Sequence, residues 1–328
     1  MALRYGPLAA LIGLVPGYFI GDGSVLAVVT GGLIGLLIGT GMVVFEVSWG
    51  IGLVPRAWRE APFLTVVLTK SLVWLVIIVV GLALPLSTLG GSSRDALVDS
   101  AFVVSIVVSF GVAAVMNLIF QVNQLMGRGV LLRLILGRYH RPREETRIFL
   151  FIDLRGSTAI AESLGNLRYH GLLRRFIADI TPPIVRFGGE IHRYVGDQII
   201  VTWTRDDGLV DAACVRCGFA MADAVERNRA RYLSEFGVAP AFWAGLHMGE
   251  VVSGEIGAVK HEIVYLGDTM NATARIEQAC REFDRPFVAS SDVVDALTLP
   301  DDAVAESLGA VTLRGIAAPL DLFALSRR

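Results

Sequence analysis

The chain has 328 residues, which is enough for two domains that each bury a core. Its composition is 54% hydrophobic and 18% charged, and its net charge of -2 lacks the basic excess that is typical of nucleic-acid binders. Three cysteines, an odd number, argue against a disulfide framework. We therefore expect no nucleic-acid partner, and we expect the Cys214 and Cys217 pair to be packed thiols rather than a zinc or redox site.

Long apolar segments fill the first 126 residues, and three of them exceed the roughly 20 helical residues that cross a hydrocarbon core of about 30 Å. These three cover residues 24–47, 62–86 and 99–121. A shorter segment, 8–20, contains Pro16 and is either a weak first span or re-entrant. A signal peptide is a further alternative, but no small-residue cleavage site precedes a soluble domain. We expect an α-helical membrane domain of about four spans over residues 1–126.

The basic residues that flank these segments predict the orientation, because arginine and lysine accumulate on the cytoplasmic side. On one side lie Arg4, Arg56, Arg59, Arg128, Arg133, Arg138, Arg141 and Arg143. Only Arg94 lies on the other side, so we expect a multi-pass protein of the cell membrane with both termini in the cytoplasm. Glu46 and Lys70 lie near the cytoplasmic side of their segments, where an unpaired charge is costly, and we predict that they contact each other.

Residues 127–146 are basic and partly amphipathic. We expect them to form a cytoplasmic linker helix that ends at Pro142. This helix should contact membrane lipid and act as a stalk through which two chains dimerise.

After this linker the pattern alternates between strands and helices, which predicts an α+β domain over residues 147–328. We expect one helix over 206–236, and a hairpin of strands 242–247 and 250–256 that turns on Met248-Gly249. The remaining expected strands are 148–154, 190–195, 198–203, 287–289 and two in the tail 311–325; the remaining expected helices are 157–180, broken near Gly165, and 271–283.

Two aspartates occupy positions that suit a metal site. Asp153 ends the first strand, and Asp197 sits in the Gly196-Asp197 turn of the next hairpin. Magnesium binds through one or two carboxylates plus substrate phosphates, and the Gly156-Ser157-Thr158 turn opens a helix whose free N–H groups suit a phosphate chain. A capped helix beside an ordinary turn aspartate is the alternative for either element alone.

Five segments together resemble the catalytic domain of class III nucleotidyl cyclases. They are "FLFIDLRGSTAIAESLG", "GGEIHRYVGDQIIVTW", "AGLHMGEVVSGEIG", "YLGDTMNATARIE" and "LRGIAAPLDLFAL", in this order along residues 147 to 326. The resemblance implies a ferredoxin-like α+β domain that acts as a homodimer, with active sites at the interface. It implies that a nucleoside triphosphate is cyclised when its ribose 3′-oxygen attacks the α-phosphate and pyrophosphate leaves.

The resemblance also implies roles for particular residues. Asp153 and Asp197 would hold two Mg²⁺ or Mn²⁺ ions, with Ile152 near them along the backbone. Asn271 and Arg275, four residues apart on one helix face, would come from the other subunit to orient the ribose and to stabilise phosphate charge. Ser157 and Thr158 would lie at the phosphates.

The positions that read the base depart from the family's pattern. Adenylyl cyclases usually have lysine where this chain has Arg193, and aspartate, threonine or serine where it has Val264. The family's later lysine corresponds to Ile316, and Arg314 could take its role. Because arginine resembles lysine more than the glutamate of guanylyl cyclases, we expect ATP as the substrate. A guanylate or relaxed-specificity cyclase, or a catalytically silent nucleotide-binding membrane sensor, are the alternatives. Neighbouring His192 should face away from Arg193 and be structural.

Overall fold

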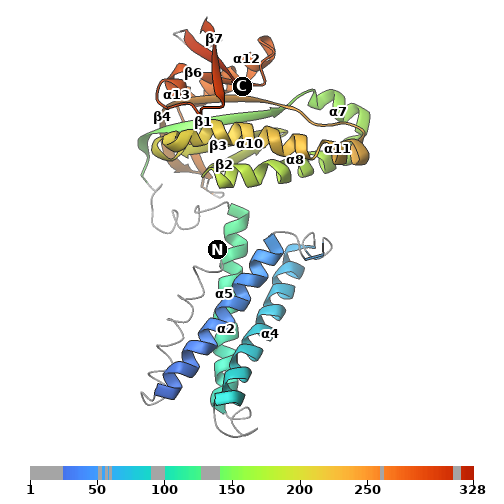
Figure 1. The fold of residues 1–328 in the computed structure, drawn as a ribbon, viewed down its shortest axis with the longest axis vertical. Coiled ribbons are helices and arrows are strands. Elements are labelled where there is room, and N and C mark those ends of the chain that lie inside the picture. Colours follow the sequence, from blue (N-terminus) through green and yellow to red (C-terminus); the bar gives the residue numbers. More distant parts are fainter. Residues whose placement is uncertain are drawn as a thin grey trace. The chain divides into compact units, whose positions relative to one another are not determined.

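The computed structural model describes residues 25–50, 54–55, 58, 61–89, 100–126, 141–258, 262–312 and 319–328. The chain forms two compact units, Met1–Met126 and Gly127–Arg328 (Figure 1). The division falls after residue 126, where the sequence places the end of the expected membrane domain. The expected segment 8–20, most of the linker and Arg314 lie outside the described residues.

The first unit contains three described helices, one for each of the three long apolar segments. They are α2 (Val25–Gly50), α4 (Phe63–Leu89) and α5 (Ser100–Met126). Two stretches, Val28–Trp49 and Leu64–Pro85, are long and apolar enough to cross a membrane, whereas the apolar stretch of α5, Ile106–Ile119, is shorter. The sequence predicts about four membrane spans. Among the described residues, two helices are long and apolar enough to cross a membrane.

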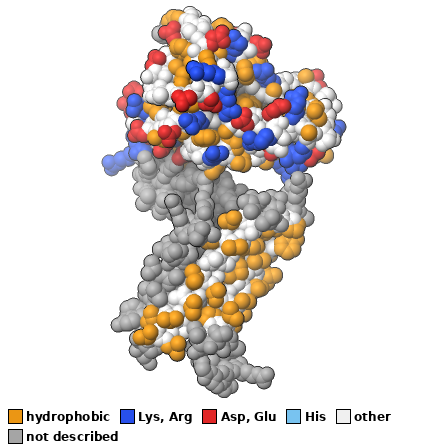
Figure 2. All heavy atoms as spheres, in the orientation of Figure 1, with side chains coloured by type: hydrophobic (Ala, Val, Ile, Leu, Met, Phe, Trp, Pro, Cys, Tyr) orange, Lys and Arg blue, Asp and Glu red, His pale blue; other side chains and the backbone are white. Residues whose placement is uncertain are grey.

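These helices carry apolar side chains on their outer surface as well as between them. Leu64, Leu68, Leu72 and Val76 of α4 are each more than half exposed. Figure 2 shows hydrophobic side chains along the described helices, while charged side chains gather on the α+β unit. A helix that is hydrophobic all round and yet not buried by its own chain is typical of a membrane span rather than of a soluble core.

The predicted contact between Glu46 and Lys70 is confirmed. The Lys70 Nζ atom lies 2.8 Å from Oε2 of Glu46 and 4.9 Å from the ring centre of Trp49. Lys70 is 1% exposed, so the ion pair neutralises a charge that would otherwise be buried without compensation. On α5, Asn117 donates to Ser71 Oγ at 3.0 Å, which adds a polar link between α5 and α4.

The second unit is built on one eight-stranded sheet in which β1 (Arg143–Leu154) is central. The strand order is β2-β3-β1-β4-β6-β8-β7, and β5 pairs with β4. The other strands are β2 (Glu190–Val195), β3 (Gln198–Thr204), β4 (Phe242–Ile256), β5 (Glu262–Leu266), β6 (Phe287–Ser290), β7 (Ala303–Val311) and β8 (Leu320–Arg327). All described pairings are antiparallel except that of β4 with β6. This arrangement confirms the expected α+β class.

Helices cover both faces of the sheet and thereby bury both faces of β1 (Figure 1). The helices are α7 (Ser157–Leu164), α8 (Asn166–Arg186), α9 (Arg205–Leu209), α10 (Ala213–Arg227), α11 (Arg229–Phe236), α12 (Asp268–Glu282) and α13 (Ser291–Val294). Ile148, Leu150 and Ile152 face α8 and α10, whereas Phe149 and Phe151 face α12. Because side chains alternate along a strand, Asp153 belongs to the α12 face.

Three sequence expectations are corrected by the sheet and its helices. The segment 206–236 is not one helix, because Asp211 and Ala212 adopt positive φ angles of 50° and 51° and separate α9 from α10, and Asn228 separates α10 from α11. The first strand begins at Arg143, so residues 143–146 are strand rather than linker. The first strand of the final pair, β7, begins at Ala303, before the expected tail.

The expected hairpin around Met248-Gly249 is also wrong, since β4 runs without a turn from Phe242 to Ile256. Met248 and Gly249 pair with Ile148 and Arg147 of the long strand β1, which leaves them no freedom to turn. The glycine serves a different purpose, which is the close approach of α12.

Helix α12 lies directly against β4 at two glycines four residues apart. A Cβ atom at Gly245 would overlap the backbone of Glu277, and one at Gly249 would lie 2.5 Å from Oγ1 of Thr269. The same threonine donates a hydrogen bond to the carbonyl of Glu250 at 2.6 Å. The two glycines therefore fix the height of α12 above the sheet, and with it the position of every side chain that α12 presents.

Candidate active site

Asp153 lies at the carboxyl end of β1 and is 9% exposed. Arg281 of α12 forms an ion pair with its Oδ2 atom and also lies 3.4 Å from Oε1 of Glu277. Burial, followed by the negative charge of Asp197, raises the pKa of Asp153, while Arg281 opposes this effect. The structure thus brings the two predicted metal-binding carboxylates close enough to influence each other.

Asp197 reaches the same place from the turn between β2 and β3, where Gly196 adopts a φ of 64°. Its Oδ2 atom is buried and has no hydrogen-bond partner among the described residues. A buried carboxylate oxygen without a donor is costly, and a cation at this point would remove that cost. Ile152 is fully buried on the other sheet face, so only its backbone could contribute to such a site.

The two carboxylates fit a magnesium or manganese site that the substrate completes. Within the described ranges no group of three or more His, Cys, Asp or Glu side chains could hold a metal ion by itself. Magnesium usually keeps only one or two protein carboxylates and takes further ligands from phosphates and water. Asp153 and Asp197 therefore match the donor set of a metal that binds together with a nucleotide.

Next to the carboxylates, α7 begins at Ser157 after Gly156, whose φ of 63° turns the chain sharply. No side chain caps this helix, so the alternative of a capped helix at Ser157 is not supported. The first N–H groups of α7 have no acceptor within the helix and point in the N-terminal direction, which favours an anion. Ser157 and Thr158 are the residues that contribute them.

Arg193 and Val264, the two positions expected to read the base, are brought near each other by Glu262. Arg193 on β2 forms an ion pair with Glu262 on β5, and Val264 lies two residues further along β5 on the same side of that strand. His192 instead packs edge-on against Tyr265 at 4.9 Å, on the opposite side. The expectation that His192 faces away from Arg193 is confirmed.

Asn271 and Arg275 lie on α12 but are not directed at Asp153 of their own chain. Arg275 donates to Oε1 of Gln278 at 2.7 Å. Glu277, two residues further, is rotated by about 200° around the helix and lies beside Arg281. The face with Asn271 and Arg275 is therefore separate from the face that meets Asp153.

Three residues at this site were not predicted from the sequence. Arg281 and Glu277 flank Asp153, and burial, followed by the charge of Asp153, raises the pKa of Glu277 to about 7. Tyr169 of α8 hydrogen-bonds Ser157; its burial and the charge of Asp197 raise the pKa of its hydroxyl. Nothing in the local sequence marks Tyr169, because the contact depends on how α8 folds back after Gly165.

The thiols of Cys214 and Cys217 are free and buried within the main core. Burial raises the pKa of Cys214 to about 12 and raises that of Cys217 as well. A thiol that stays protonated is a poor metal ligand and a poor nucleophile. This agrees with the expectation of packed thiols.

With fold and site described, the relationship to known proteins is clear. Residues 139–325, more than half of the chain, match the adenylate and guanylate cyclase catalytic domain family. The chain belongs to this family, and the expected class III cyclase domain is confirmed.

Particular relatives give the comparison more detail. The chain is 39% identical to adenylate cyclase 2 of Rhizobium meliloti (strain 1021) over 235 residues, which cover 72% of this chain and 64% of that protein. It is 27% identical to an adenylate cyclase of Anabaena cylindrica over 157 residues, which cover 46% of this chain and 31% of that protein. The matched part is thus less than two thirds of either relative.

Two solved structures share the fold. The adenylyl cyclase CyaB from P. aeruginosa aligns with a TM-score of 0.51 and 19% identity, covering 57% of this chain and 97% of that one. A bacterial light-regulated adenylyl cyclase aligns with a TM-score of 0.56 and 17% identity, covering 67% of this chain and 65% of that one. At such identities the likeness concerns the fold.

The environment of His192 leads to a prediction about pH. Burial, followed by the positive charge of Arg193, lowers the pKa of His192 to about 4. In the unfolded chain a histidine titrates near 6.5, so the unfolded state binds more protons between these values, and the free energy of unfolding falls as pH drops from about 6.5 to 4. We expect His192→Gln to remove on the order of 2 kcal/mol of this pH dependence. Thermal unfolding measured across this pH range provides the test.

His170→Gln is the matched control, because His170 is exposed on α8. It should leave the dependence of Tm on pH as in the unchanged protein. An unaltered slope in His192→Gln would show that this ring is not buried in its neutral form.

Proposed function

We propose that this chain is an adenylate cyclase that converts ATP to 3′,5′-cyclic AMP and pyrophosphate at the interface of a homodimer. The observation that carries the proposal is the meeting of Asp153 and Asp197 at one end of the sheet, beside the uncapped start of α7. The names of the relatives from Rhizobium and Anabaena support adenylate cyclase as the activity.

In this proposal each group at the site has one task. Asp153 and Asp197 hold the divalent ions, and the N–H groups at the start of α7 bind and orient the phosphate chain. Bound divalent ions would supply neutralisation of phosphate charge and polarisation of the reacting oxygens. The buried surroundings of Asp153 keep water away and strengthen these electrostatic interactions.

In this proposal a second protomer completes the active site, because α12 presents its polar side chains on two separate faces. Glu277 and Arg281 meet Asp153 of their own chain, which leaves Asn271 and Arg275 on another face. Asn271 is exposed and can therefore reach a nucleotide held by a second copy. We assign it to the ribose, and we assign Arg275 to the negative charge that develops on the phosphates.

This shared site predicts complementation between two inactive variants. Asp153→Ala removes one half of the site and Arg275→Ala removes the other, so each variant alone should be inactive. After mixing and subunit exchange, half of the dimers would carry one intact site, which restores about a quarter of the activity. Cyclic AMP formation from ATP with Mn²⁺ measures this directly.

A mixture of Asp153→Ala with Asp197→Ala is the matched control, because both changes lie in the same half of the site. That mixture should stay inactive. If the first mixture were as inactive as its components while the unchanged protein turns over ATP, the shared site would be excluded. If the unchanged protein dimerises but forms no cyclic nucleotide, the chain is a nucleotide-binding sensor instead.

The preference for ATP rests on Arg193, and a guanylate or relaxed-specificity cyclase is the second candidate. The observation that favours it is Val264, whose side chain cannot form a hydrogen bond with the base. Arg193 is held by Glu262, so its guanidinium is fixed at the place where the family usually has lysine. A fixed planar cation and a flexible point charge present different donors to a purine.

We expect Arg193→Lys to raise the ratio of kcat/KM for ATP over that for GTP by roughly tenfold, which corresponds to about 1.4 kcal/mol. Parallel assays with both nucleotides measure this ratio. Arg205→Lys, an exposed change at the start of α9, is the control and should leave the ratio unaltered. An equal ratio in Arg193→Lys and the unchanged protein would mean that this position does not read the base.

We further propose that the first unit anchors the enzyme in the cell membrane, with about four spans, both termini in the cytoplasm and the catalytic unit on the cytoplasmic side. The outward apolar surface of α2 and α4 supports this, because water would not stabilise it. The charge pair of Glu46 and Lys70 is compatible with a lipid surround, since it leaves no lone buried charge.

The anchoring predicts that the full chain stays in the membrane pellet after extraction with alkaline carbonate. A chain beginning at Arg141 keeps the whole sheet and should appear in the soluble fraction, which makes it the control. Release of the full chain by carbonate would contradict a spanning arrangement. Cysteines introduced in the loop around Arg94 and at the C-terminus would report the two sides with an impermeant reagent.

A further inference from the structure

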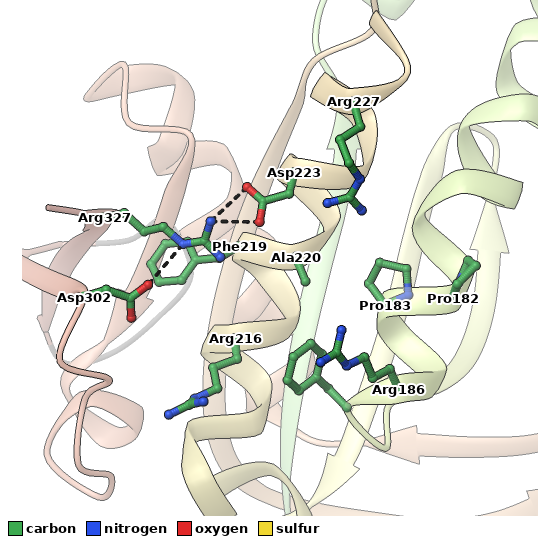
Figure 3. A pocket seen from close by; sticks show the side chains of 11 residues that line it. Pro182, Pro183, Arg186, Arg216, Phe219, Ala220, Asp223, Arg227, Asp302 and Arg327 are labelled. Carbon is green, nitrogen blue, oxygen red and sulfur yellow. Dashed lines mark hydrogen bonds and ion pairs between the residues drawn. The ribbon is translucent and has the colours of Figure 1, made fainter.

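A cleft of about 400 Å³ lies on the face of the α+β unit that α8 and α10 cover, between these two helices and the strand β8 (Figure 3). Its walls come from the C-terminal end of α8, from one stripe of α10, from Arg327 of β8 and from Asp302, which precedes β7. Asp153 lies on the opposite face of the sheet, under α12. The cleft is therefore separate from the candidate active site.

Three arginines at this cleft have no ionic partner. Arg186, Arg216 and Arg227 line it, and none of their guanidinium groups forms an ion pair or a hydrogen bond with another described residue. Elsewhere in the unit most described arginines are paired, as in Arg175 with Glu235 and Arg285 with Glu306. Arg216 and Arg227 lie on one stripe of α10, three turns apart, and Arg186 lies at the end of α8, so the cleft offers cationic groups along its length that an anion would neutralise.

The two acidic side chains at the cleft, Asp223 and Asp302, both form ion pairs with Arg327. Arg327 binds Asp223 through both carboxylate oxygens at 2.8 Å and lies 3.5 Å from Asp302, as the dashed lines in Figure 3 show. These two carboxylates and Arg327 form the wall toward β8. The lining holds four arginines and two aspartates, so it carries a net charge of +2 in a chain whose net charge is -2.

The floor between these charges is apolar. Pro182 and Pro183 of α8 face Ala220 of α10 across the cleft, and Arg186 stacks over the ring of Phe187 at 5.5 Å. The ring of Phe219 lies on the β8 side of α10, 5.0 Å from the guanidinium carbon of Arg327. An apolar floor with cationic groups at the rim suits a ligand that has a flat apolar body and an anionic end. Guanidinium groups bind the paired oxygens of phosphate esters and carboxylates through two hydrogen bonds.

We propose that this cleft is a second ligand site, which binds a small organic anion with two negative charges, of the aryl phosphate type, through Arg186, Arg216 and Arg227. The two charges of the ligand balance the net charge of the lining, and its apolar body covers Pro183 and Ala220. The ligand would tie the end of α8 to α10. Residue 186 is the last of α8 and lies four residues before β2, the strand that leads to Asp197.

The test is a titration of the full-length protein in detergent with phenyl phosphate, followed by calorimetry. EDTA is present throughout, so that no divalent ion supports phosphate binding at the catalytic carboxylates. We expect saturable binding that weakens steeply with salt, and at least fivefold weaker binding of inorganic phosphate, which lacks the ring. The measured quantity is binding and does not depend on cyclase activity. Failure of this test and failure of the proposed function can therefore be told apart.

Two changes at the site, together with one control, make the assignment specific. The triple variant Arg186→Gln, Arg216→Gln, Arg227→Gln should weaken binding of phenyl phosphate at least tenfold. The control triple Arg168→Gln, Arg205→Gln, Arg285→Gln removes the same charge from exposed positions outside the cleft and should bind as the unchanged protein does. Ala220→Glu places a carboxylate on the floor and should abolish binding while all arginines remain.

The proposal is overturned if the unchanged protein shows no saturable binding of phenyl phosphate. It is equally overturned if both triple variants bind alike, because the interaction would then reflect overall charge rather than this cleft. Retained binding in Ala220→Glu, confirmed as folded by its thermal transition, would also exclude the site.

Discussion

Strand β1 is buried on both faces, and this constraint determines where the carboxylate of Asp153 lies. Ile148, Leu150 and Ile152 pack against α8 and α10, so the side chains between them must face α12. A shift of one residue in register would expose both sets to the wrong surroundings. Asp153 is the next side chain on the α12 face, and its carboxylate is therefore held at the end of the strand by the burial of the five residues before it.

Helix α12 depends on the same sheet through two glycines. Gly245 and Gly249 let its backbone approach β4 directly, and the ends of the helix then fall at fixed heights above the sheet. One face of α12 gives Arg281 to Asp153, and another presents Asn271 outward. A single helix thus serves two neighbourhoods, which is the geometric reason for assigning the complete site to two protomers.

The sequence allowed strand ends and tight turns to be predicted, because neighbouring residues mark them. It did not allow features to be predicted that depend on how helices pack against the sheet. Asp153 after an apolar run and Asp197 in a Gly-Asp turn were predictable, because strand ends and tight turns are marked by neighbouring residues. Gly249 was misread as a turn, because a glycine that allows a helix to approach looks the same in sequence as one that bends the chain. The break at Asp211 and Ala212 was not marked clearly either, because an aspartate that tolerates the left-handed region is also common inside helices, and alanine favours the helix. Arg281 and Tyr169 reach the site only through the fold.

The ion pair in the first unit has a consequence for how the protein is made. A lysine in a lone apolar helix raises the free energy of inserting that helix into a bilayer, by about 3 kcal/mol at the helix centre and by less toward its ends, and Lys70 lies in the first third of α4. Among the described residues Lys70 of α4 is paired with Glu46 of α2, with Trp49 alongside. Under the proposed anchoring, α4 would therefore enter a bilayer at a lower free-energy cost together with α2 than alone, because the pair carries its two charges already neutralised.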